Sequence, residues 1–101
     1  MRRPIVLAAV LLSAGAPAAY AGPIERACLS SDRPGISRAV CGCIQQAADL
    51  TLSTRDQRVA ANFFRDPHKA QELRTSDRRS DEECWARYRS FGETAETYCR
   101  N

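Results

Sequence analysis

The sequence is poor in the large apolar side chains that fill protein cores. Leu, Ile, Val and Phe account for only 12 of the 80 residues that follow position 21. Such a composition combined with a high net charge is typical of disordered chains, but in this stretch 13 basic residues face 12 acidic ones. We therefore predict a small folded domain that needs cross-links to stay closed. The same charge balance disfavours a general nucleic-acid binder.

The residue patterns that usually carry catalysis are missing as well. The chain has one His, one Met at its first position, and no C-x-x-C-H, G-x-S-x-G, H-E-x-x-H or Gly-rich phosphate loop. His68 follows Asp66-Pro67 at an expected helix start, which favours an exposed first-turn residue over a catalytic base. Glu82 and Glu83 could be imagined as an acid/base pair, but at an expected helix amino terminus their negative charges more simply complement the helix dipole. We expect no enzyme, no metal site and no cofactor.

The only long apolar run stands at the amino terminus. A short positive start, Met1-Arg2-Arg3-Pro4, precedes an apolar stretch over residues 5–14, and Ala19-Tyr20-Ala21 offers a small-x-small cleavage pattern before Gly22. The run is too short for a permanent membrane anchor. We predict a cleaved signal peptide at 1–21 and a single small helical domain at 22–101, periplasmic or secreted and not an integral membrane protein.

Caps and apolar spacing predict an all-α fold, a small disulfide-stapled bundle of about four helices, because nothing alternates as a strand would. Pro23 can open a short helix, and a second helix is expected over about 36–52. A capping box of Ser53 with Asp56 launches a third helix, which Asp66-Pro67 interrupts before a short helix that ends near residue 73.

The last helix is expected to begin at a second capping box, Ser80 with Glu83. Its apolar residues recur at alternating spacings of four and three, which predicts one core-facing stripe. The stripe consists of Cys84, Tyr88, Phe91, Ala95 and Tyr98.

Helix geometry narrows the pairing of the five cysteines. On a helix, Cys41 and Cys43 point about 200° apart, so a bond between them is difficult. Cys84 and Cys99 would lie about 22 Å apart on the last helix, which excludes that pair. We favour Cys28 with Cys41 and Cys43 with Cys99, because Cys43 lies on the stripe where the last helix should dock and Cys41 points toward the first helix. The main rival joins Cys43 to Cys84 instead.

In the favoured pairing Cys84 is the odd thiol, free or available for a covalent dimer. Cys41-Gly42-Cys43 also leaves a redox interpretation open, since a flexible C-x-C unit could close a strained ring that exchanges with thiols. Its spacing is not that of a thioredoxin-like site, so two structural half-cystines are the simpler interpretation.

Of the 13 basic residues after position 21, 12 are Arg. Arg makes forked contacts to carboxylate and phosphate, so a cluster would suit an anionic partner such as lipid head groups, a polyanionic glycan or an acidic protein. The alternative is a solvated face with interleaved acidic residues. The candidate patch around the start of the last helix consists of Arg74, Arg78, Arg79, Arg87 and Arg89.

Four segments carry a resemblance to known sequences: Cys41-Gly42-Cys43-Ile44-Gln45, Asp56-Gln57-Arg58, Phe63-Phe64-Arg65-Asp66-Pro67-His68 and Trp85-Ala86-Arg87-Tyr88-Arg89-Ser90-Phe91-Gly92. Together they resemble a group of short exported alphaproteobacterial proteins of unassigned role, some of which are labelled "arginine transporter". The resemblance transfers no catalytic or ligand residue. A chain with one cleavable apolar segment also lacks the spanning helices that a transport path needs.

We expect a small exported non-catalytic helical protein that binds another macromolecule at the cell envelope, either an envelope protein or an anionic surface. Two alternatives stay open. One is a periplasmic thiol-disulfide carrier that uses Cys41 and Cys43, and the other is a small-molecule, arginine-like binding component.

Overall fold

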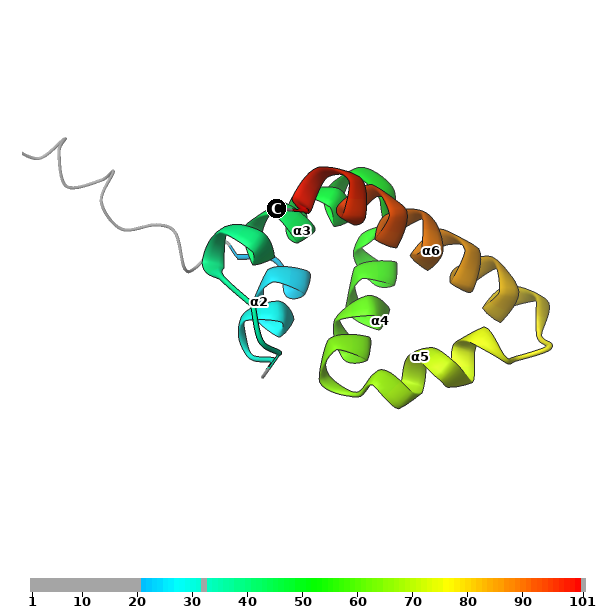
Figure 1. Ribbon diagram of the computed structural model, residues 1–101. Coiled ribbons are helices and arrows are strands. Elements are labelled where there is room, and N and C mark those ends of the chain that lie inside the picture. The colour runs from blue at the N-terminus through cyan, green and yellow to red at the C-terminus, as the bar shows by residue number, and fades with distance from the viewer. Residues whose placement is uncertain (1–20, 32, 101) are drawn as a thin grey trace, which may run out of the picture.

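The computed structural model describes residues 21–31 and 33–100. Within these ranges the chain forms five helices and no strand, which confirms the all-α prediction (Figure 1). The helices are α2 (Pro23–Leu29), α3 (Arg38–Thr51), α4 (Thr54–Arg65), α5 (Pro67–Arg74) and α6 (Arg79–Cys99). The expected signal peptide lies outside the described residues except for Ala21.

Short polar side chains start most of the helices, as the sequence predicts. Pro23 is the first residue of α2, where its missing N–H costs nothing. The hydroxyls of Ser37 and Ser53 accept hydrogen bonds from the main-chain N–H groups of Val40 and Asp56, both at 3.1 Å. The α4–α5 boundary is Asp66, whose carboxylate accepts from the main-chain nitrogen of the second residue of α5 at 3.2 Å.

Two predicted boundaries are wrong. The second helix begins at Arg38 rather than Ile36, because Ser37 and not an earlier residue caps it. The last helix begins at Arg79, with Arg78 at the N-cap position, so Ser80 with Glu83 is not a capping box. Ser76 takes the polar role in front of this helix: its hydroxyl accepts from the Arg78 N–H at 3.2 Å and donates to the Asp81 carboxylate at 2.7 Å.

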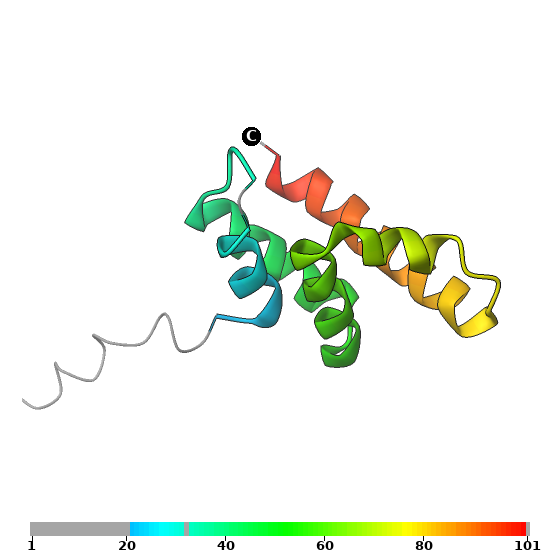
Figure 2. The same cartoon turned by 90° about the horizontal axis from the view of Figure 1, so that it is seen from below.

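The core lies where α2, α3, α4 and the second half of α6 meet. Helix α2 packs against both α3 and α4, α6 runs along α3, and α5 connects α4 to the start of α6 (Figures 1 and 2). Helix α5 itself buries no residue. Small side chains let the helices approach closely, and the cluster consists of Ile24, Ala27, Ala47, Ala48, Leu52, Ala60, Ala61 and Phe91.

Aromatic rings join α4 to α6. The Phe63 and Tyr88 rings meet edge to face with centroids 5.0 Å apart, and the Tyr88 and Phe91 centroids are 5.8 Å apart. Phe91 is only 3% exposed, but Tyr98 is 73% exposed, so its prediction as a core residue is wrong. A strict seven-residue repeat drifts by about 20° per heptad around a straight helix. Two heptads beyond Cys84, the stripe has turned out of the interface.

A buried amide pair ties α2, α3 and α4 together. The Gln45 side chain donates to Gln57 Oε1 at 2.8 Å and to the Asp49 carboxylate at 2.9 Å, and its own Oε1 accepts from the Glu25 N–H at 2.9 Å. Gln57 in turn donates to the same Asp49 oxygen at 3.1 Å. Because buried polar groups cost free energy unless they are paired, this network fixes how the three helices meet.

Candidate functional site

Two disulfides cross-link the helices. Cys28 of α2 bonds to Cys41 of α3, and Cys43 of α3 bonds to Cys99 at the end of α6. These are the two pairs that the helix geometry favours. One bridge therefore closes the α2–α3 corner and the other fastens the carboxyl-terminal end of the chain.

Cys43 does not lie on the most buried face of α3, where the sequence predicts it. Cys41, not Cys43, is the fully buried half-cystine: Cys28 and Cys41 are 0% exposed, whereas Cys43 and Cys99 are half-buried. The reason is that α2 covers the inner face of α3, while α6 runs along its flank. A hollow of about 170 Å³, with Val40 and Tyr98 in its walls, lies beside the Cys43–Cys99 bridge.

Accessibility predicts the order in which the bridges are reduced. A reducing thiolate must reach a sulfur atom, so we expect a mild thiol reductant to open Cys43–Cys99 well before Cys28–Cys41 in the folded protein. Timed alkylation with peptide mass mapping would measure this order. Simultaneous labelling of all four cysteines would show that the buried bridge is not protected.

Cys84 is the free cysteine among the described residues and is half-buried on α6. Burial raises the pKa of its thiol, and the neighbouring Asp56 carboxylate adds to the rise, while Arg87 partly opposes it. A thiol with a raised pKa holds less thiolate at neutral pH. Since the thiolate is the nucleophile, the environment of Cys84 argues against easy formation of a covalent dimer.

Alkylation kinetics test this environment. Because the pKa is raised, we expect Cys84 in the oxidised folded protein to react at pH 8 several-fold more slowly than in urea, with the folded-state rate still rising at more alkaline pH. The urea sample is the matched control, since it removes burial and the Asp56 charge together. Equal rates in the two samples would contradict the burial of the thiol.

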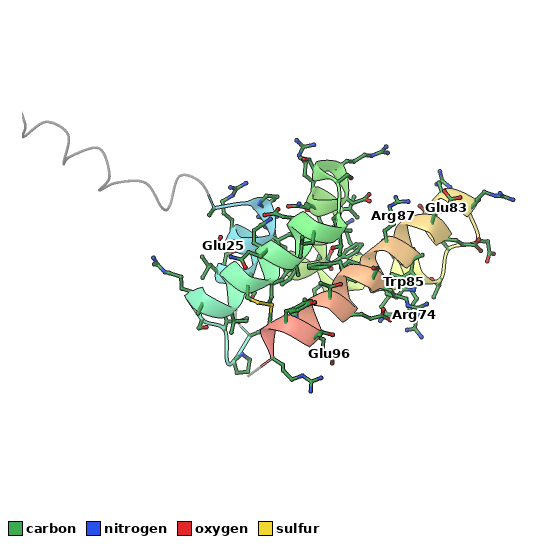
Figure 3. All side chains as sticks on the ribbon, turned by 90° about the horizontal axis from the view of Figure 1, so that it is seen from above. Glu25, Arg74, Glu83, Trp85, Arg87 and Glu96 are labelled. Atoms are coloured by element: carbon green, nitrogen blue, oxygen red, sulfur yellow. A yellow bond between two sulfur atoms is a disulfide. The ribbon has the colours of Figure 1, made fainter. Side chains whose placement is uncertain are left out.

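The five arginines predicted as a patch do not share one face. Arg87 and Arg89 are two residues apart on α6, so they point to different sides of the helix. Arg87 turns toward α4, where its Nε lies 2.6 Å from the Asp56 carboxylate, and this hydrogen bond raises the Arg87 pKa. Figure 3 shows Arg74 on another side of α6 from Arg87. Arg78 and Arg79 are exposed at the start of α6. The structure therefore does not bring the five predicted arginines together in one patch.

Residues with catalytic side chains are scattered in the described ranges. His68 is exposed and forms an i, i+4 pair with Glu72 at 3.5 Å, and Glu82 and Glu83 are exposed. Over residues 21–31 and 33–100, no group of three or more His, Cys, Asp or Glu side chains is placed to hold a metal ion. In the same ranges, no helix has the length and apolar character to cross a membrane.

A different set of arginines gathers along the seam between α2 and α4. Arg26 of α2 and Arg58 and Arg65 of α4 line a hollow of about 550 Å³ together with Thr54 and Asn62. All three guanidinium groups belong to exposed residues, and none forms a salt bridge with a described carboxylate. Arg26 donates a hydrogen bond to the main-chain carbonyl of Ala21. The hollow therefore offers positive charge without a neutralising carboxylate from the described chain.

Arg65 also lines a second hollow, of about 580 Å³, whose walls include Arg33 and Phe64. The Arg33 guanidinium carbon lies 5.7 Å from the centre of the Phe64 ring, which positions it at that end by a cation–π contact. We name these two hollows, which share Arg65 as a lining residue, the arginine trough, defined by Arg26, Arg33, Arg58 and Arg65.

None of the four trough arginines belongs to the patch predicted from the sequence, although the spacing on α4 carries part of the signal. Arg58 and Arg65 are seven residues apart and Ala61 lies between them, a spacing that places all three on one face of α4. Arg26 joins them because α2 packs on α4, and Arg33, in the connection after α2, joins them through its contact with Phe64 of α4. No local pattern encodes either contact. No family model, curated protein or solved structure matches the chain.

Proposed function

We propose that the chain is a small exported, non-catalytic helical protein that binds an anionic macromolecule at the cell envelope through the arginine trough. The observation that carries this proposal is the alignment of Arg26, Arg58 and Arg65 in one hollow without a described carboxylate partner. Forked guanidinium groups suit carboxylate, phosphate or sulfate. The two disulfides support export, because such bonds persist in oxidising compartments.

The two alternatives from the sequence have weaker support. A dithiol carrier built on Cys41 and Cys43 needs these residues to pair with each other, whereas each bonds to a cysteine on another helix. Free arginine would match the trough only through its carboxylate, since its guanidinium group meets positive charge there. We expect calorimetry with arginine to give no heat of binding, and a saturable heat would restore the small-molecule alternative.

Affinity capture from envelope extract tests the proposal. The bait is the purified oxidised protein, compared with the triple variant Arg26→Gln, Arg58→Gln and Arg65→Gln. The matched control is Arg74→Gln, Arg78→Gln and Arg79→Gln, which removes the same charge from exposed positions outside the trough. We expect a partner that wild type and control retain and the trough variant loses, with retention falling as salt is raised.

Retention by all three baits, or equal loss in both triple variants, would refute the proposal. Retention by all three baits would show that the partner binds elsewhere on the surface. Equal loss in both triple variants would show that binding depends only on net charge. Thermal melting of each bait verifies that the substitutions leave the fold intact.

A further inference from the structure

We infer that the occupant of the arginine trough is an extended acidic peptide segment of a partner protein, in which carboxylates alternate with apolar side chains. The inference rests on the proposed function and deepens it. It follows from the length of the trough, the nature of its lining and the polar groups along it.

The trough is elongated. Its α4 wall runs from Thr54 to Arg65, which spans roughly 16 Å at the helical rise per residue. An extended chain covers that length with about five residues, and its alternate side chains point to the same face. Arg58 and Arg65 stand about 10 Å apart along the axis. Arginine side chains are long enough to meet carboxylates two or four positions apart on such a strand.

The lining is only partly charged. Ala61 and Ala27 contribute to the walls but are almost wholly buried already. The apolar surface open to water is that of Pro23 in the first hollow and of Pro34 and Phe64 in the second. Apolar side chains between the carboxylates of a peptide would cover these surfaces and remove them from water. A sulfated or phosphorylated glycan carries no such groups, and a concave trough does not fit the flat plane of lipid head groups. The mixed lining therefore favours a peptide.

Two neutral polar side chains are placed to pair with the main chain of such a peptide. The Thr54 hydroxyl and the Asn62 carboxamide line the first hollow, and neither side chain hydrogen-bonds to another described residue. A hydroxyl and a carboxamide can each donate and accept, which matches a peptide main chain with its N–H and C=O groups. A phosphate or sulfate group would use only their donors.

Binding of synthetic ligands tests the inference. The probe is a fluorescent five-residue peptide, Asp-Leu-Glu-Leu-Asp with blocked ends, titrated by anisotropy into the oxidised protein at low salt. Its matched control is Asn-Leu-Gln-Leu-Asn, which keeps the shape and removes the charge. We expect the acidic peptide to bind at least about tenfold more tightly than the amide peptide, the effect of about 1.4 kcal/mol.

Protein variants locate the binding. We expect Arg58→Gln with Arg65→Gln to weaken the acidic peptide at least about tenfold, and Arg74→Gln with Arg79→Gln to leave its affinity unchanged. The double variant Arg58→Lys, Arg65→Lys keeps the positive charge but loses the forked guanidinium groups. Its affinity for the acidic peptide should therefore lie between those of the wild type and of the double Gln variant. Equal weakening by the trough and control pairs would overturn the inference.

Two further ligands separate failure of the inference from failure of the proposed function. These are a sulfated oligosaccharide and phosphatidylglycerol vesicles. If either binds with dependence on Arg58 and Arg65 while the peptide does not, the peptide inference is overturned and the trough remains a binding site. If no ligand needs the trough arginines for binding, and the trough variant captures the same envelope partners as the wild type, both the peptide inference and the proposed function fail.

Discussion

Replacing Cys43 and Cys99 together by Ala is expected to lower the free energy of unfolding by about 4 kcal/mol. The bridge joins residues that are 56 positions apart, so its loss releases a long loop in the unfolded chain. A small domain has only about 5–15 kcal/mol in total, and this one has few large apolar residues to compensate. Urea denaturation followed by circular dichroism would measure the change.

Cys84→Ala is the matched control for the bridge variant, because it removes one half-buried thiol without opening a loop. We expect it to change the free energy of unfolding by less than about 1 kcal/mol. The Cys28→Ala, Cys41→Ala variant should lose about 3 kcal/mol of loop entropy for its separation of 13 residues. If the Cys43, Cys99 variant unfolds at the urea concentration of the wild type, the apolar core suffices and the disulfide is dispensable.

Phe91→Ala is expected to cost about 3–5 kcal/mol, in the range for removal of a core aromatic side chain. Phe91 is the buried residue of α6 and is 3% exposed. Its ring also supports Tyr88, whose hydroxyl has a raised pKa because burial disfavours the phenolate. We therefore expect a lower urea midpoint and a weaker near-ultraviolet signal from the aromatic cluster.

Tyr98→Ala is the matched control on the same helix. The Tyr98 side chain is 73% exposed, so its removal should change the free energy of unfolding by no more than about 0.5 kcal/mol. Equal effects of Phe91→Ala and Tyr98→Ala would contradict the way that α6 lies on the core. Together with the bridge variant, these substitutions measure the separate contributions of the ring and of Cys99 in holding α6.

Local chemistry explains why most of the elements could be predicted. Ser53 with Asp56 and Asp66 with Pro67 act within a few residues of themselves, and their hydrogen bonds are present in the structure. The bridge partners could be inferred because a rigid helix separates the directions of neighbouring cysteines. The predicted start of α6 was wrong because the hydroxyl of Ser76, rather than that of Ser80, makes the polar contacts in front of this helix.

The candidate site was harder to predict, since it depends on packing between helices. Sequence proximity grouped Arg87 with Arg89, but a helix points residues two apart to different sides, and Asp56 of α4 neutralises Arg87. Arg26 and Arg58 are far apart in the sequence and meet only where α2 lies on α4. Charge clusters of this kind follow from tertiary structure, which composition and spacing do not contain.

The backbone at Gly22 comes so close to the Gln45 side chain that a β-carbon there would lie 2.5 Å from its carboxamide. Any larger residue would displace an amide that holds Glu25, Asp49 and Gln57 at once. A side chain at position 22 therefore requires the Gln45 carboxamide to move, which would disturb the hydrogen bonds that join α2, α3 and α4.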